Sequence, residues 1–178
     1  MARLRRDTKL LSFKILYIGA AHSGKSTSLA QLQASLRSES ASVLTSSVIA
    51  SEPTLFFEVQ IPDANTLEGY ASVLQVYTVP GEMKYRATIQ MLLDGADGVV
   101  FVVDSVAERH PHNVRAWNQL LAAMDDSDRT FDDLPLVFQY NKADLATSVA
   151  KDPLDLFYNG GSIRHPSFQT DASRGTQL

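Results

Sequence analysis

The sequence predicts an α/β fold of three layers, in which helices cover both faces of a mixed, mostly parallel sheet. Three short, continuous apolar runs at 14–19, 97–104 and 135–141 have the composition of strands buried on both faces. Segments with helical spacing of apolar residues follow the first two runs. This alternation favours parallel strands, because a parallel connection needs a crossover, which is usually a helix.

Length and composition indicate one soluble domain, which we take as residues 1–178. A chain of 178 residues can bury one sizeable core, and 44% hydrophobic with 20% charged residues is typical of a globular protein. The net charge of −4 gives no case for nucleic-acid binding. The absence of cysteine excludes disulfides and thiolate metal sites, and it suits a cytoplasmic location. No apolar run reaches the length that stable membrane insertion needs, and the basic segment 1–12 is expected to be flexible.

Apolar periodicity defines the elements of the N-terminal half. After the strand at 14–19, a helix is expected over 25–37, where leucines recur at helical spacing. The Ser- and Ala-rich segment 39–53 shows no period and is interpreted as a loop. Residues 54–61 alternate between apolar and polar, as in a half-exposed strand, and 72–79 is expected to be the antiparallel partner. We therefore expect one antiparallel strand at an edge of the sheet.

The C-terminal half continues the alternation. A helix after 97–104 and a shorter one after 135–141 are expected, the second beginning at Asp152–Pro153 and stopping at 159–161. Residues 165–170 are expected to form a short last strand. The apolar face of the first of these helices is expected to contain Val114, Trp117, Leu121 and Met124.

A phosphate-binding pattern follows the first strand. Gly19 and the triplet Gly24-Lys25-Ser26 satisfy the spacing G-x-x-x-x-G-K-[ST] between a strand and a helix. Such a loop wraps backbone N–H groups around phosphate at the positive end of the helix dipole. Lys25 is expected on the β- and γ-phosphates and the Ser26 hydroxyl on Mg²⁺. The residues of the same loop that are expected to line the site are His22, Ser23 and Thr27.

A candidate base-binding pattern, NKAD, ends the strand at 135–141. In open α/β sheets ligands bind beyond the carboxyl ends of the strands. The carboxylate of Asp144 is expected to accept from the N1–H and the 2-amino group of guanine, a donor pair that adenine lacks. Asn141 is expected to tie this loop to the phosphate loop, and the stem of Lys142 to lie over the base. Together the two patterns predict a guanine-nucleotide site that takes GTP or GDP.

These motifs resemble those of the small Ras-like GTPases, and most closely the bacterial MglA-type GTPases of cell polarity and gliding motility. The stretches that carry the resemblance span 14–145 and are GAAHSGKST, TLFF, TVPG, DGVVFVVDS and QYNKADL. The resemblance implies a Ras-like P-loop fold and a switch that binds GTP or GDP with Mg²⁺. It also implies a regulator of the roadblock fold (MglB-type) that promotes hydrolysis, and polarity effectors.

The resemblance further implies roles for individual residues. Thr54 would complete the Mg²⁺ shell, and the backbone of Gly81 would sense the γ-phosphate. Thr78 stands where most Ras-like proteins have an Asp, as in the MglA type. The implied segments are switch I at 39–54, switch II at 81–93 and a last guanine loop at 168–173, where the Ala172 amide would face the base.

Three departures from the family pattern fall on hydrolysis, in which Glu82, Thr54 and Lys25 are the expected catalytic residues. Glu82 stands where these GTPases have a Gln that orients the attacking water, and an ionised carboxylate would repel the γ-phosphate. Pro53 stands where many MglA-type proteins have an arginine finger, and Ala21 crowds a position that is commonly Gly. These departures predict slow intrinsic hydrolysis. The alternatives are that Glu82 acts as a base, that a partner supplies an arginine, and that Ala21 is tolerated.

Two other functions are weighed against a switch. A GTP-binding scaffold that does not hydrolyse would keep both binding motifs. A P-loop small-molecule kinase would need an acceptor site and an Arg-rich lid, which the sequence lacks, and it would have no use for NKAD. The sequence also shows no long helix after Ala172, so a partner or a second copy of the chain is expected to cover an apolar patch of the sheet.

Overall fold

The computed structural model describes residues 3–5, 9–36, 45–49, 52–60, 70–79, 81 and 86–176. Within them the sheet has eight strands in the order β3-β4-β5-β2-β6-β7-β8, with β1 paired to β2 off this path. The strands are β1 (Arg3–Arg5), β2 (Leu10–Gly19), β3 (Thr45–Ile49), β4 (Glu52–Gln60), β5 (Ala71–Thr78), β6 (Gly98–Asp104), β7 (Leu136–Asn141) and β8 (Ser167–Thr170). The strands β5, β2, β6, β7 and β8 run parallel, whereas β1, β3 and β4 are antiparallel to their neighbours. The predicted mixed, mostly parallel sheet is confirmed.

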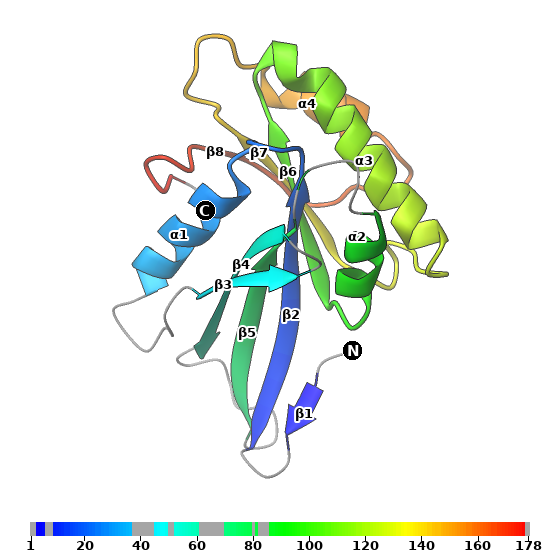
Figure 1. Cartoon of the computed structure of the whole chain (residues 1–178). Helices are drawn as coiled ribbons and strands as arrows, with labels where there is room; N and C mark the ends of the chain where they lie inside the picture. Colours follow the sequence, from blue (N-terminus) through cyan, green and yellow to red (C-terminus); the bar gives the residue numbers. More distant parts are fainter. Residues whose placement is uncertain are drawn as a thin grey trace.

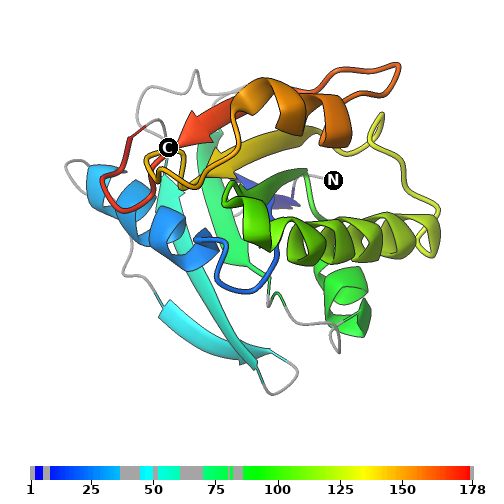
Figure 2. The ribbon, with the colours of Figure 1, turned by 90° about the horizontal axis from the view of Figure 1, so that it is seen from above.

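Helices cover both faces of the sheet. The α-helices are α1 (Lys25–Leu36), α2 (Arg86–Leu93), α3 (His110–Asp125) and α4 (Lys151–Tyr158), and a 3₁₀ turn, η2 (Ala107–Arg109), leads into α3. Figures 1 and 2 show α1 on one side of the sheet and α2, α3 and α4 on the other. This arrangement confirms the three-layer α/β fold.

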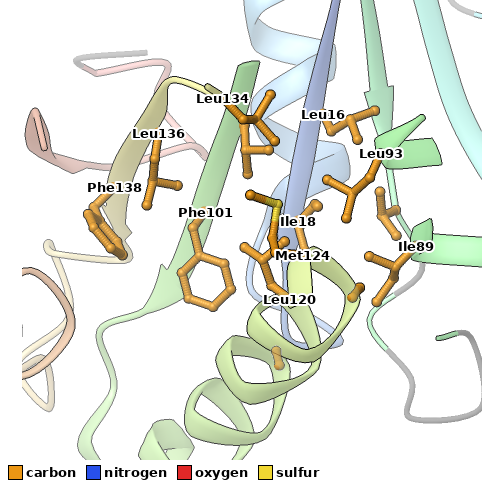
Figure 3. Packing of buried hydrophobic residues seen from close by; sticks show 14 of the residues in the cluster. Leu16, Ile18, Ile89, Leu93, Phe101, Leu120, Met124, Leu134, Leu136 and Phe138 are labelled. Carbon is orange, nitrogen blue, oxygen red and sulfur yellow. The ribbon is translucent and has the colours of Figure 1, made fainter. Parts of the chain in front are cut away.

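The larger core lies between the sheet and the α2–α3–α4 layer. Leu16 and Phe101 from the central strands meet Leu93 of α2 and Leu120 of α3, and all four side chains are fully buried (Figure 3). A smaller cluster on the α1 side joins Leu29 to Tyr17, Val76 and Val102. Burying a side chain such as Leu or Phe stabilises the fold by about 1.5–3 kcal/mol. The two cores together fix β2, whose carboxyl end carries the phosphate loop.

The edge of the sheet differs from the prediction. The segment 39–53, interpreted as a loop, contains β3, which pairs with β4 in an antiparallel hairpin with Ser47 opposite Thr54. The strand predicted at 54–61 is therefore second from the edge, and there are two antiparallel strands there instead of one. Ser and Ala residues give no apolar alternation, so the pairing of β3 with β4, which only the folded chain supplies, decides this strand.

Part of the segment 1–12 pairs in the sheet, and its flexibility stays a prediction. The strand β2 begins at Leu10, four residues before the apolar run, and β1 (Arg3–Arg5) pairs with it. Backbone pairing stabilises these residues although their side chains form no apolar run.

The helices α3 and α4 are offset from their predicted faces and bounds. Of the predicted face, Met124 is buried and Trp117 packs against the core, whereas Leu121 is exposed. The rest of the buried stripe of α3 is formed by Asn113, Ala116, Leu120 and Ala123. The small and polar residues of this stripe are invisible to a search for large apolar side chains. The N-cap of α4 is Ala150, two residues before the predicted N-cap Asp152, and its C-cap is Asn159, where the stop was predicted. On α2, Ile89 and Leu92 are core residues.

Candidate nucleotide-binding site

The phosphate loop joins the end of β2 at Gly19 to the start of α1 at Lys25. The first turn of α1 contains no acidic residue, so the positive end of its dipole is open to an anion. A cavity of about 280 Å³ lies at this point. Its lining residues are His22, Gly24, Lys25, Ser26 and Thr27, which are five of the residues expected to bind phosphate.

Lys25 is a buried cation with neutral partners. Its Nζ donates to the backbone oxygens of Gly19 at 3.0 Å and Ala20 at 2.7 Å. Burial lowers the pKa of Lys25 to about 8. A phosphate placed here would supply the opposite charge that the ammonium group lacks among these contacts.

The backbone of the loop is held in uncommon conformations. His22 adopts a φ of 62°, and the fully buried Ser23 hydroxyl has no hydrogen-bond partner in the described part of the chain. Gly24 has a φ of 100°, and a Cβ there would lie 2.0 Å from Nδ2 of Asn141. Strained backbone and an unpaired buried hydroxyl are features of sites that await a ligand.

The base side of the site is a second cavity of about 260 Å³. It shares His22, Gly24 and Thr27 with the phosphate cavity, so the two form one continuous site. Its lining residues are His22, Gly24, Thr27, Asn141, Lys142, Asp144, Leu145, Asp171, Ala172 and Ser173. Asp144 is exposed to this cavity, as an acceptor for a base must be.

Asn141 joins the two halves of the site. Its Nδ2 donates to the Ser23 carbonyl of the phosphate loop at 2.8 Å. Its Oδ1 accepts from Thr170 Oγ1 at 3.1 Å and from the Ala172 amide at 3.0 Å. The Ala172 amide is thus bonded to Asn141 in this structure, and Ala172 lines the base cavity, so the contact of its amide with the base stays a prediction.

Asp104 and Arg109 belong to this site but are missing from the sequence-based set. Lys142 Nζ donates to Oδ2 of Asp104 at 2.7 Å, and Arg109 Nη2 donates to the Ala21 carbonyl of the phosphate loop at 2.6 Å. An acid at the carboxyl end of a buried strand was the available clue, since that end faces the ligand.

The residues expected at the γ-phosphate are placed only in part. Gly81 lies against the phosphate loop, where an added Cβ would come within 2.3 Å of the Ala21 nitrogen. The backbone of Pro53 and Thr54 lies in β4, but their side chains are outside the described part. Glu82 also lies outside the described residues. Thr78 is buried at the end of β5.

The donor set suits Mg²⁺ bound together with phosphates. The Ser26 hydroxyl is exposed in the first turn of α1, next to Lys25. No cluster of three His, Cys, Asp or Glu residues that could hold a metal is found in the described ranges. Magnesium at nucleotide sites is held by one or two protein ligands plus phosphate oxygens and water, so a hydroxyl at this position fits.

The comparison with protein families decides the identity. The model of the ADP-ribosylation factor family matches residues 2–174 of the chain. This chain belongs to the ADP-ribosylation factor (Arf) family. It is thus a small GTPase by family, with a P-loop α/β fold and a site for guanine nucleotide.

Curated relatives of this Arf-family protein agree with that assignment. The Mutual gliding-motility protein MglA of Myxococcus xanthus (strain DK1622) is 30% identical over 175 residues, which are 98% of this chain and 89% of the relative. A Ras and EF-hand domain-containing protein of Xenopus tropicalis is 28% identical over 48% of this chain and 11% of its own length. Its homolog in Mus musculus is 32% identical over 44% of this chain and 12% of its own length. The Arf-family protein has no helix, among its described residues, of the length and apolarity needed to span a bilayer.

Proposed function

We propose that this Arf-family protein is a Mg²⁺-dependent GTP switch of the cytoplasm whose own hydrolysis is slow. The observation that carries the proposal is the side chain of Asn141, which holds the phosphate loop and the base loop in one frame. Lys25 would hold the β- and γ-phosphates, Ser26 the Mg²⁺ ion and Asp144 the guanine base. The bound Mg²⁺ would neutralise charge on the phosphate oxygens.

The contact of Gly81 with the phosphate loop supports a switch. Gly81 is close enough to the Ala21 nitrogen that any side chain would collide with the backbone. A γ-phosphate at the end of this loop would be within reach of the Gly81 segment, whereas GDP would leave that contact unmade. The difference gives the two nucleotides different affinities for the two conformations, which is the requirement for a switch.

Slow hydrolysis is supported by the chemistry of Ala21, Pro53 and Glu82. Pro53 has no side-chain donor, and an arginine finger contributes about 10³–10⁵ to the rate in related reactions. Ala21 belongs to the part of the loop that Gly81 contacts, so its methyl group would take space beside an attacking water. Ionised Glu82 would place negative charge beside the negatively charged oxygens of the γ-phosphate.

Single-turnover hydrolysis of bound GTP with Mg²⁺ tests the rate. The natural protein should be slow, and the double variant Glu82→Gln, Pro53→Arg should be faster by at least about tenfold, since an oriented water and one added cation each contribute. The single variants separate the two effects. A natural protein that already matches the double variant would overturn slow hydrolysis and make Glu82 the working group.

A second experiment separates the switch from a non-hydrolysing scaffold. A scaffold is favoured by the same three residues, because all of them weaken chemistry and leave binding intact. It requires that GTP and GDP hold the protein in one conformation. Hydrogen exchange over 45–60 and 81–93 in the two nucleotide states distinguishes them, since a switch protects these segments with GTP and a scaffold shows no difference.

The cellular role is proposed from the relative of similar length. The name of the Myxococcus xanthus protein refers to gliding motility. We propose a related role in bacterial cell polarity or motility, with a roadblock-fold regulator that promotes hydrolysis and with polarity effectors. The sheet face beside α1, where Ile15 and Val100 are only partly buried and Phe168 is 51% exposed, is the surface on which a partner or a second copy would dock.

A further inference from the structure

Asp104 holds a fixed position at the carboxyl end of β6. Its amide donates to Oδ1 of Asn113 on α3 at 3.1 Å, and Nδ2 of Asn113 donates back to the Asp104 carbonyl at 2.8 Å. Both residues are buried, and the side chain of Asp104 has no exposed surface. This clamp fixes the backbone from which the Asp104 carboxylate projects.

Two cations converge on the Asp104 carboxylate. Lys142 Nζ lies 2.7 Å from Oδ2, and Arg109 Nε lies 3.5 Å from the same oxygen. The other oxygen, Oδ1, accepts from the Val106 amide at 3.2 Å. A buried carboxylate is costly unless it is compensated, so this acid and its two cations hold one another in place.

Each cation also belongs to a different half of the nucleotide site. The Arg109 guanidinium reaches the Ala21 carbonyl of the phosphate loop at 2.6 Å, across 88 residues of sequence. Lys142 lines the base cavity, with a φ of 65° that turns it away from the strand direction of β7. We name Asp104, Arg109 and Lys142 the carboxylate bridge.

We propose that the carboxylate bridge couples recognition of the phosphates to recognition of the base, with Asp104 and Arg109 as positioning residues. Arg109 sets the orientation of the Ala21 peptide and so of the loop amides that follow it. Asp104 fixes the ammonium of Lys142, so that the Lys142 stem is held as a wall of the base cavity. The proposal rests on the proposed function only in taking this cavity as a guanine-nucleotide site.

The test compares equilibrium affinities for GDP and IDP, because IDP lacks the 2-amino group that Asp144 would accept from. Arg109→Ala should weaken the binding of GDP and of IDP by about tenfold each, the effect of losing a charge-assisted hydrogen bond. It should leave the ratio of the two affinities unchanged. Asp104→Asn removes the charge that holds both cations. It should weaken GDP binding by a similar factor. It should also lower the ratio of GDP affinity to IDP affinity by about threefold or more, since one hydrogen bond contributes at least this much.

The double variant supplies a readout that a general loss of stability would not reproduce. In the Asp104→Asn background, Arg109→Ala should reduce the affinity for GDP clearly less than it does in the natural protein, because the guanidinium has already lost its contact with the Asp104 carboxylate. Additive effects on the affinity for GDP would overturn the coupling. An unchanged GDP-to-IDP ratio in a folded Asp104→Asn protein would also overturn it.

Two controls keep the outcome decisive. Arg164→Ala removes an exposed arginine from the loop before β8, and it should bind both nucleotides as the natural protein does. If Asp104→Asn does not fold, Arg109→Ala still tests the phosphate half, because the Arg109 side chain is 27% exposed and its loss leaves no apolar cavity. Natural protein that binds neither GDP nor GTP would instead contradict the proposed function.

Discussion

The side-chain amide of Asn141 donates to the backbone carbonyl of Ser23 at 2.8 Å, although the two residues are 118 positions apart. The oxygen of the same side chain accepts from Thr170 and from the Ala172 amide. Asn141 is buried, and these hydrogen bonds are made inside the protein. One side chain therefore connects the phosphate loop, the base loop and the segment after β8.

The first prediction concerns this connection. Asn141→Ala would leave the Ser23 carbonyl and the Ala172 amide without partners, at a cost of about 1–3 kcal/mol for each buried group. We expect the dissociation rate of a fluorescent GDP analogue to rise by about tenfold or more, which corresponds to the lower part of that cost. Asn118→Ala, at an exposed position of α3, is the control and should leave the rate unchanged. An unchanged rate in Asn141→Ala would show that the two loops hold their geometry independently.

The second prediction concerns the contact of Gly81 with the phosphate loop. In Gly81→Ala the new Cβ would lie 2.3 Å from the Ala21 nitrogen and 2.7 Å from the Gly19 oxygen, and backbone atoms cannot move aside by changing rotamer. The Gly81 segment would be displaced, and its amide would lose the γ-phosphate. We expect the affinity for GTPγS to fall by about tenfold relative to the affinity for GDP, as for one lost charge-assisted hydrogen bond.

The control for this variant is Gly161→Ala, where the nearest atom to the added Cβ is 3.9 Å away. It should change neither affinity. If Gly81→Ala has the same ratio of GTPγS affinity to GDP affinity as the natural protein, Gly81 does not sense the γ-phosphate.

The third prediction is the pH dependence that Lys25 causes. Burial lowers the pKa of Lys25 to about 8 from the model-peptide value of 10.5, so the ammonium form is disfavoured in the folded protein. Phosphates would favour the ammonium form and raise this pKa, so that binding takes up a proton above pH 8. The affinity for GDP should therefore fall as pH rises from 8 to 9, by up to about tenfold per unit, and Lys25 itself should contribute no slope between pH 6 and 7.

A Lys25→Met variant isolates this effect. It should bind GDP more weakly and lose the fall between pH 8 and 9. The same slope in both proteins would assign the pH dependence to another group or to the nucleotide. Without nucleotide the sign for stability is the opposite: the unfolded chain binds more protons between the two pKa values, so the unfolding free energy contributed by Lys25 rises with pH from 8 to 9.

The fourth prediction tests the base. The Asp144 carboxylate lies exposed in the base cavity, where it would accept two donors from guanine. Asp144→Asn presents a donor beside an acceptor, which suits the 2-oxo group of xanthine instead. We expect GDP affinity to fall at least about 100-fold and XDP affinity to rise, because unpaired polar groups in a recognition site are costly. Competition binding measures both, and Asp152→Asn, exposed on α4, is the charge-matched control.

Local patterns were sufficient for much of this site. The phosphate loop and NKAD are continuous stretches, and each follows an apolar strand, so their position at the carboxyl ends of β2 and β7 could be predicted. Parallel strands bring these ends together at one edge. For the same reason the link from Asn141 to the phosphate loop could be expected from its place after β7.

The remaining features depend on pairing between distant segments. The pairing of β3 with β4 is made by backbone hydrogen bonds, which leave no trace in a Ser- and Ala-rich sequence. The buried face of α3 is selected by the neighbours that it packs against, so alanines and Asn113 are buried while Leu121 is not. The Ala172 amide has Asn141 as its partner because β8 lies beside β7, and no local motif specifies that choice.

By itself the sequence determined the chemistry of the two nucleotide-binding loops, since those residue types at that spacing have few other uses. Only the tertiary structure decided how the loops are joined. Asp104 and Arg109 come from the end of β6 and the turn η2 after it, whereas Lys142 follows β7, and together they form no motif. They meet because β6 lies between β2 and β7, and because a buried carboxylate is stable only where folding brings cations to it.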